Sequence, residues 1–324
     1  MTTRVTGCFI AIALVVALAV PASATPPGQN GLLVWARAGG GLPNVWVANP
    51  DGSAQRRLFA KKGSGGVEGT FSPTDADQMF FTRFSEKPFS DDIYRGNLAT
   101  GQVARVIGGR AADLAPTVSP DGTKIAYFSV PRPKRIREDV PPPPERINVA
   151  NIDGSGARAL TPKNKRSLDP DWSPDGTRLV YCEARIVGED IFQNRLMLMN
   201  ADGSGRRALT RFGGVDEINP KWMPDGQSIV FEQLRERSPR SDIASITPDG
   251  SDVRVILSTK AWETNPVPSP DGRRFVFTSD RDRRGRERLG PGFEVYTMAV
   301  DGSDVVRVTN NRQLDFFPDW QRLP

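Results

Sequence analysis

The sequence predicts an all-β fold, a six-bladed β-propeller with four-stranded blades, and three observations lead to it. A short strand followed by a turn and an apolar strand recurs six times along the chain. The copies are 46 to 54 residues apart, and a period near 50 is typical of closed propellers and solenoids. The last copy stops after its first strand, while the region after residue 30 begins like a second strand. Both chain ends would therefore complete one blade, which closes the ring and removes exposed sheet edges.

The first strand of each unit is defined by a recurring short stretch. Its copies are VEGTFSP (67–73), LAPTVSP (114–120), LDPDWSP (168–174), INPKWMP (218–224), TNPVPSP (264–270) and FFPDWQ (316–321). The residue at the third position of each copy forms what we call the column: Gly69, Pro116, Pro170, Pro220, Pro266 and Pro318.

The second strand of a unit follows an Asp-Gly pair in four copies, at Asp121, Asp175, Asp225 and Asp271. Glycine adopts the positive φ that a tight hairpin turn requires. The strands that follow, such as KIAYFS and RFVFTS, are continuously apolar, which favours a sheet covered on both faces.

The third and fourth strands flank a second turn, which reads Asp-Gly-Ser in five units and Thr-Gly in the sixth. These turns begin at Asp51, Thr100, Asp153, Asp202, Asp249 and Asp301. The mature chain would start at NGLLVWAR, which matches a second strand. We therefore expect one propeller domain over residues 31–324, after a short linker at 25–30.

Residues 1–24 have the pattern of an export signal. Arg4 precedes an apolar run from Cys8 to Val20, and Ala22-Ser23-Ala24 matches a cleavage site. The run is short for a membrane span, so we expect cleavage after Ala24 rather than retention as an anchor. The protein is then predicted to be periplasmic or extracellular, with no stable membrane span.

The residue counts exclude several chemistries. The sequence contains no histidine, which rules out Ser-His-Asp and Cys-His catalysis and removes the commonest zinc ligand. Cleavage leaves Cys182 as the one cysteine, and its apolar neighbours favour a buried side chain over a reactive thiol. The formal net charge of +5 is too weakly basic to indicate a nucleic-acid partner.

The repeat resembles the WD-like propeller repeats of the TolB family: WSPDG, an apolar strand, a D-I-Y-like strand, then DG-S and L-T. The resemblance covers about residues 30–324 and implies a six-bladed propeller. The family's namesake carries an α/β domain before its propeller, and the resemblance here is to the propeller alone. A similar propeller precedes the hydrolase domain of prolyl oligopeptidase-like peptidases, but the sequence has no G-x-S-x-G motif.

Three loops between second and third strands are long or basic, at 130–147, 233–241 and 280–292. We expect them to share one face and to bind an acidic partner, either an anionic glycan or a protein surface. The alternative is a set of solvated charged loops, because acidic residues are interleaved. The basic residues are Arg132, Lys134, Arg135, Arg137, Arg235, Arg237, Arg240, Arg281, Arg283, Arg284, Arg286 and Arg288.

Carboxylates recur at fixed distances before the column. Asp113, Glu217, Glu263 and Asp315 stand three positions before it, and Glu68 and Asp169 stand one before it. If the first set converges on the axis, its oxygens could hold calcium. The alternative is that such carboxylates accept backbone hydrogen bonds from the next blade.

Trp172, Trp222 and Trp320 occupy one repeat position. We expect them to pack between blades rather than to form a sugar platform.

These observations favour an exported, monomeric, non-enzymatic binding scaffold without a required cofactor. Its partner would be a protein or an anionic glycan, held by the variable loops and the axial funnel. The rival hypotheses are a secreted glycoside hydrolase or lyase that uses axial carboxylates, and a passive structural protein of the envelope.

Overall fold

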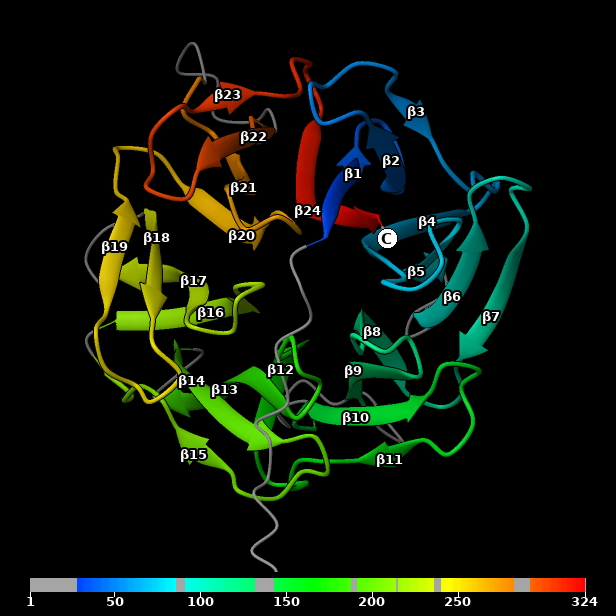
Figure 1. Cartoon of the computed structure of the whole chain (residues 1–324). Helices are drawn as coiled ribbons and strands as arrows, with labels where there is room; N and C mark the ends of the chain where they lie inside the picture. The colour runs from blue at the N-terminus through cyan, green and yellow to red at the C-terminus, as the bar shows by residue number, and fades with distance from the viewer. Residues whose placement is uncertain are drawn as a thin grey trace, which may run out of the picture.

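The computed structural model describes residues 28–85, 91–131, 143–187, 191–213, 215–235, 240–282 and 292–323. Every regular element in these ranges is a β-strand, and they contain no helix long and apolar enough to cross a membrane. The described strands form six four-stranded sheets, which surround a central axis as blades (Figure 1). The predicted six-bladed propeller with four-stranded blades is confirmed.

Blade 1 is built from both ends of the chain, as the sequence predicts. Its strand order from the axis outward is β24 (Leu314–Leu323), β1 (Gln29–Ala38), β2 (Asn44–Ala48) and β3 (Arg56–Arg57). Strand β1 begins inside the segment expected to be a linker and pairs antiparallel with β24, so that Gln29 faces Leu323. This pairing closes the ring.

Blades 2 to 6 each use four consecutive strands. Blade 2 contains β4 (Ser64–Phe71), β5 (Gln78–Ser85), β6 (Asp92–Asn97) and β7 (Val103–Ile107). Blade 3 contains β8 (Ala112–Val118), β9 (Lys124–Val130), β10 (Arg146–Asn151) and β11 (Arg158–Ala159). Blade 4 contains β12 (Arg166–Trp172), β13 (Arg178–Val187), β14 (Ile191–Asn200) and β15 (Arg207–Ala208). Blade 5 contains β16 (Val215–Trp222), β17 (Ile229–Arg235), β18 (Ser241–Ile246) and β19 (Arg254–Leu257). Blade 6 contains β20 (Glu263–Pro268), β21 (Arg274–Ser279), β22 (Glu294–Ala299) and β23 (Val306–Arg307).

The hydrophobic core is a ring of clusters between neighbouring blades. One cluster joins Ala126 and Ile147 of blade 3 to Trp172 and Tyr181 of blade 4, and other clusters repeat the arrangement. Trp172, Trp222 and Trp320 are all buried in such clusters, so the expected packing role is confirmed. Cys182 is also buried, and burial raises the pKa of its thiol well above the ordinary value. This agrees with an inert core residue.

Each innermost strand carries a β-bulge at the column. In every blade the residue just before the column has a positive φ near 50°, and the register with the next strand shifts there. These residues are Glu68, Ala115, Asp169, Asn219, Asn265 and Phe317. A bulge bends the strand and turns side chains to a new direction. Here it directs residues on both sides of the column into the axis.

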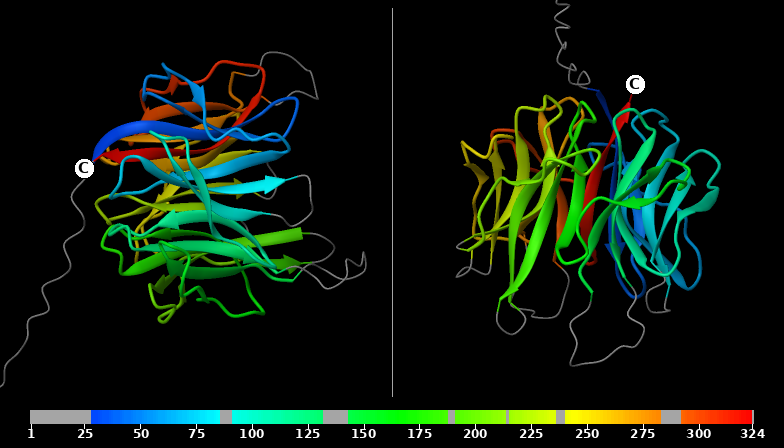
Figure 2. Two further views of the ribbon diagram at one scale, coloured as in Figure 1. Left: turned by 90° about the vertical axis from the view of Figure 1, so that its right-hand side faces the viewer. Right: turned by 90° about the horizontal axis from the view of Figure 1, so that it is seen from below.

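The hairpin turns and the loops lie on opposite faces of the ring. We call the face with the Asp-Gly turns the turn face, and the face where second strands lead into third strands the loop face. The innermost strands run toward the turn face, and the C-terminus lies there at one end of the ring axis (Figure 2).

The glycine of the second turn is required by its close packing on the preceding blade. Gly154 has a φ of 86°, and a Cβ atom there would collide with the carbonyl oxygen of Val106 on β7. Gly154→Ala is expected to lower the free energy of unfolding by about 1–3 kcal/mol, because it combines backbone strain with this collision. Urea denaturation tests this against Gly109→Ala, where a Cβ meets open space and a change below about 0.5 kcal/mol is expected. Equal effects of the two variants would contradict the packing argument.

Candidate functional site

The column lines an axial cavity of about 90 Å³. Four prolines of the column and Gly69 contribute to its wall, together with the bulge residues that precede the column in each blade. The cavity therefore arises from one repeated backbone feature, the bulge in each innermost strand.

Glu68, Asp169, Lys221 and Asp319 line the axial cavity, and Asp171 contacts Lys221. We call these five charged side chains the axial cluster. Lys221 Nζ lies 3.5 Å from Asp171 Oδ1, and Asp169 and Asp319 also act on it electrostatically. The Lys221 side chain is 33% exposed to solvent although it lies near the ring axis. Since Lys221 lines the axial cavity, this exposed surface faces the cavity. One ammonium group thus lies among four carboxyl groups.

Most carboxyl groups of the axial cluster are already used as links within and between blades. Glu68 Oε2 accepts hydrogen bonds from the Ala115 amide of blade 3 and from the Thr82 hydroxyl, each at 2.7 Å. Asp171 Oδ2 accepts the Trp222 amide of blade 5 at 2.8 Å. The alternative expectation, that carboxylates near the column accept backbone hydrogen bonds from the next blade, is confirmed for Glu68.

Burial changes the protonation of the axial cluster. Burial raises the pKa of Glu68 to about 7, against hydrogen bonds from Thr82 and Ala115 that lower it. Burial likewise raises the pKa values of Asp169 and Asp319 to about 6, although Lys221 opposes both shifts. Burial alone would lower the pKa of Lys221, but Asp171, Asp319 and Asp169 raise it above its ordinary value. The lysine therefore stays charged while Glu68, Asp169 and Asp319 titrate near neutral pH.

The sequence pattern indicates only part of this cluster. Glu68 and Asp169 belong to the carboxylates that precede the column, whereas Asp171, Lys221 and Asp319 follow it by one position and are not predicted. The column itself contained the signal, because a bulge turns the residues on either side of the column toward the same cavity.

The four carboxylates predicted to hold calcium lie in separate blades, at the starts of innermost strands. Asp113 accepts a hydrogen bond from Ser129, and Glu217 accepts one from Thr210 at 3.0 Å. Burial raises the pKa of Asp113, and raises that of Glu217 to about 7.

The other two predicted calcium ligands pair with arginines. Glu263 Oε1 lies 2.9 Å from Arg281 Nη2, and Asp315 is bound by Arg37. Across the described ranges, no three acidic or cysteine side chains are grouped closely enough to hold a metal ion. Calcium binding by these residues stays a prediction.

Two of the predicted basic residues on the loop face have described side chains. Arg240 is exposed, while Arg281 pairs with Glu263 and lies over the rings of Phe277 and Tyr296, each 5.3 Å from the guanidinium carbon. Arg235 ends β17, and its side chain lies outside the described part. The remaining members also lie outside the described residues: Arg132, Lys134, Arg135, Arg137, Arg237, Arg283, Arg284, Arg286 and Arg288.

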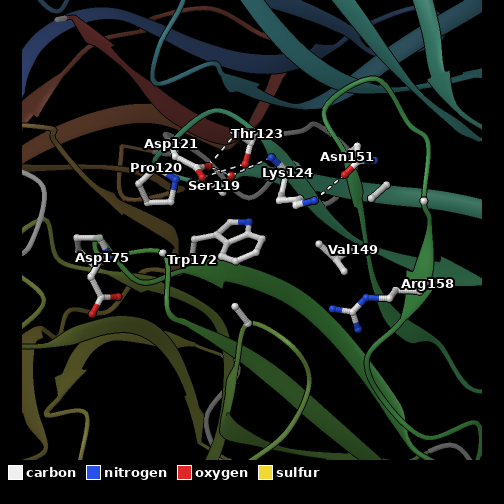
Figure 3. A pocket seen from close by; sticks show the side chains of 15 residues that line it. Ser119, Pro120, Asp121, Thr123, Lys124, Val149, Asn151, Arg158, Trp172 and Asp175 are labelled. Atoms are coloured by element: carbon white, nitrogen blue, oxygen red, sulfur yellow. Dashed lines mark hydrogen bonds between the residues drawn. The ribbon is translucent and has the colours of Figure 1, made fainter. Parts of the chain in front are cut away.

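A larger cavity lies on the turn face between blades 3 and 4. We call it the turn-face groove, and its volume is about 570 Å³. The residues that line it include Asp121, Lys124, Asn151, Arg158, Trp172 and Asp175 (Figure 3). The indole of Trp172 lies in the middle, with Lys124 and Arg158 to one side and Asp121 and Asp175 to the other. The sequence pattern did not predict this groove, although lysine at 124 occupies the repeat position that carries arginine at 178.

Two curated relatives match part of the chain. A dipeptidyl-peptidase 5 of Porphyromonas endodontalis is 33% identical over 109 residues, which cover 33% of this chain and 15% of the relative. An uncharacterized protein of Agrobacterium fabrum is 31% identical over 189 residues, which cover 58% of each. The chain therefore spans less than two thirds of the length of either relative.

Solved structures share the fold at low sequence identity. TolB from Acinetobacter baumannii has a TM-score of 0.69 at 16% identity, covering 90% of this chain and 66% of that one. An oligogalacturonate lyase in complex with manganese has a TM-score of 0.60 at 18% identity, covering 89% and 76%. The shared propeller thus occurs in proteins of different function, and at this identity the likeness concerns the fold alone.

The family follows from a direct sequence match. The profile of the TolB beta propeller domain matches residues 138–322, which is more than half of the chain. This match agrees with the six closed blades and with the repeat motif that defines them. The chain belongs to the TolB beta propeller domain family.

Proposed function

We propose that this chain is a non-catalytic binding scaffold, whose partner is a protein or an anionic glycan. One observation carries the proposal: the cavity that is large enough for a ligand is not the cavity that contains carboxyl groups able to donate a proton. A hydrolase of the type considered above needs two carboxyl groups beside a bound sugar, and one of them needs a raised pKa.

The axial cluster has raised pKa values but little room. Its cavity of about 90 Å³ is well below the roughly 300–1,000 Å³ of ordinary ligand pockets. Glu68 and Asp171 are also engaged in hydrogen bonds between blades, which leaves them poorly placed to exchange protons with a substrate.

The turn-face groove has the room but lacks a proton donor. Burial would raise the pKa of Asp121, but hydrogen bonds from Ser119 and Thr123 outweigh it and lower that pKa. Asp175 has the same balance, with hydrogen bonds from Ser173 and Thr177. Both groups are therefore ionised at neutral pH and unsuited to act as general acids.

The known activities of similar proteins do not argue against this proposal. The match to the dipeptidyl-peptidase covers 15% of that protein, and the present sequence has no histidine for a serine-peptidase triad. The oligogalacturonate lyase shares the fold alone. We propose that the partner contacts the loop face and the mouth of the axial funnel, and that the protein acts in the periplasm or outside the cell.

A turnover assay tests the proposal. The protein at high concentration is incubated with acidic and neutral oligosaccharides and with dipeptidyl substrates, and new reducing ends, unsaturated sugars and released dipeptides are followed. We expect no product above the buffer control. Product that the wild type forms and Asp169→Asn does not form would overturn the proposal, because Asp169 is the axial carboxyl group best able to serve as the acid.

A further inference from the structure

We propose that the turn-face groove between blades 3 and 4 binds an acidic sugar, with its carboxylate held by Lys124 and Arg158 and its ring against Trp172. This rests on the proposed non-catalytic binding function, but it places a ligand on the face opposite the variable loops. The same position in the next pair of blades differs from this groove in one contact.

One repeat position differs between this groove and the corresponding place in the next pair of blades, because it carries lysine rather than arginine. Lys124 and Arg178 both begin a second strand, and each faces an asparagine at the end of the third strand. Between blades 4 and 5, Arg178 lies over the ring of Trp222, with its guanidinium carbon 4.8 Å from the ring centroid. Between blades 3 and 4, Lys124 Nζ instead donates to Asn151 Oδ1 at 2.5 Å. The lysine therefore lies to the side of Trp172 and leaves space in front of it (Figure 3).

The groove has two ends of opposite charge. Lys124 and Arg158 lie at one end, and Arg158 uses Nη1 to donate to the carbonyl of Asp202 at 3.1 Å. An arginine has five N–H donors and an ammonium group three, so both retain donors for an anion. Charge-assisted hydrogen bonds of this kind are the strongest that a carboxylate can accept.

The opposite end accepts hydrogen bonds. Ser173 and Thr177 donate hydrogen bonds to Asp175 Oδ1, and Oδ2 of the same carboxylate can accept one from a ligand hydroxyl. Between the two ends lie Val149 and the part of Trp172 that remains exposed, 7% of that residue. A ring with a carboxylate on one side, hydroxyl groups on the other and an apolar C–H face matches this order.

An extended peptide fits the groove less well. A peptide that adds to a sheet needs an edge strand with unpaired backbone groups. Among the strands that line the groove, β10 already pairs with β9 on one side and β11 on the other, and the outermost strand β11 spans only Arg158–Ala159. Recognition must therefore come from side chains, which favours a sugar over a peptide strand.

Ligand-observed NMR with glucuronate and galacturonate tests the site, with glucose and galactose as uncharged counterparts. We expect the two uronates to bind and the neutral sugars to bind about tenfold more weakly or not at all, since a charge-assisted hydrogen bond is lost. Lys124→Arg retains the charge but should place a guanidinium over Trp172, as Arg178 does over Trp222. We expect this variant to lose uronate binding while its melting temperature stays at the wild-type value.

Matched variants separate this site from others. Arg158→Gln should weaken uronate binding by about tenfold. Arg207→Gln, at the same repeat position in blade 4 and outside the groove, should leave it unchanged. The site is refuted if neither uronate binds, if glucose binds as well as glucuronate, or if Lys124→Arg binds like the wild type.

A loss of uronate binding on Arg240→Gln, with Lys124→Arg unaffected, would move the ligand to the loop face. That result would overturn the turn-face site but leave the proposed binding function standing. Conversion of the sugar to a product would instead overturn the binding function.

Discussion

Asp315→Asn is expected to lower the free energy of unfolding by about 3–5 kcal/mol, because it leaves a buried arginine without its counter-charge. Asp315 on β24 is fully buried, and both of its carboxylate oxygens accept from Arg37 on β1, at 2.6 and 2.9 Å. The guanidinium also lies over the rings of Trp35 and Trp46. This pair joins the last strand to the first, so its loss weakens the contact that closes the ring.

Urea denaturation followed by tryptophan fluorescence measures this effect. Asp252→Asn is the matched control, because it removes the partner of Arg254 in an ion pair at the exposed surface and should change nothing measurable. A loss below about 1 kcal/mol for Asp315→Asn would show that ring closure does not depend on this pair.

The second large effect is a fall in stability as the pH rises from about 4.5 to about 7, and Glu68→Gln should remove part of this fall. The folded pKa of Glu68 is about 7, above its ordinary value of 4.5, so the folded state holds a proton that the unfolded chain has released. Between these two values the folded state binds more protons, and raising the pH therefore lowers the free energy of unfolding. Glu68 alone accounts for about 3 kcal/mol of this decline, since each pKa unit corresponds to about 1.4 kcal/mol.

Glutamine is the suitable replacement because its amide oxygen can still accept from Ala115 and Thr82. We expect Glu68→Gln to be more stable than the wild type at pH 8 and close to it at pH 5. Unfolding curves at several pH values give the slopes directly. Parallel pH profiles for the two proteins would contradict the protonated state of Glu68 in the folded protein.

The sequence predicted the fold well because the fold consists of repeated local signals. The Asp-Gly turns, the apolar second strands and the column recur in the same order along the chain. Each copy of the repeat is a weak signal alone, but the six copies support each other. The match of the two chain ends predicted the pairing of β1 with β24, which the structure contains. Burial of Trp172, Trp222 and Trp320 followed from the same repeat position.

The candidate sites were harder to predict because they depend on small differences between equivalent positions. The bulges at Ala115 and Phe317 have a positive φ that neither residue type favours, so no local signal announces them. Because the sequence does not predict the bulges, it also does not predict that Asp171, Lys221 and Asp319 point toward the axis. The turn-face groove likewise depends on whether a cation covers a tryptophan, which Lys124 and Arg178 decide differently.

The most direct test of the central claim is an NMR measurement. The ¹H spectrum of a uronate tetrasaccharide is recorded over one day in the presence of an equal amount of protein. The central claim is that this propeller binds its ligand without converting it. We predict broadened sugar resonances that recover their sharpness when the protein is removed, with no new signals. New resonances from shortened or unsaturated sugars would contradict the claim and identify the chain as an enzyme.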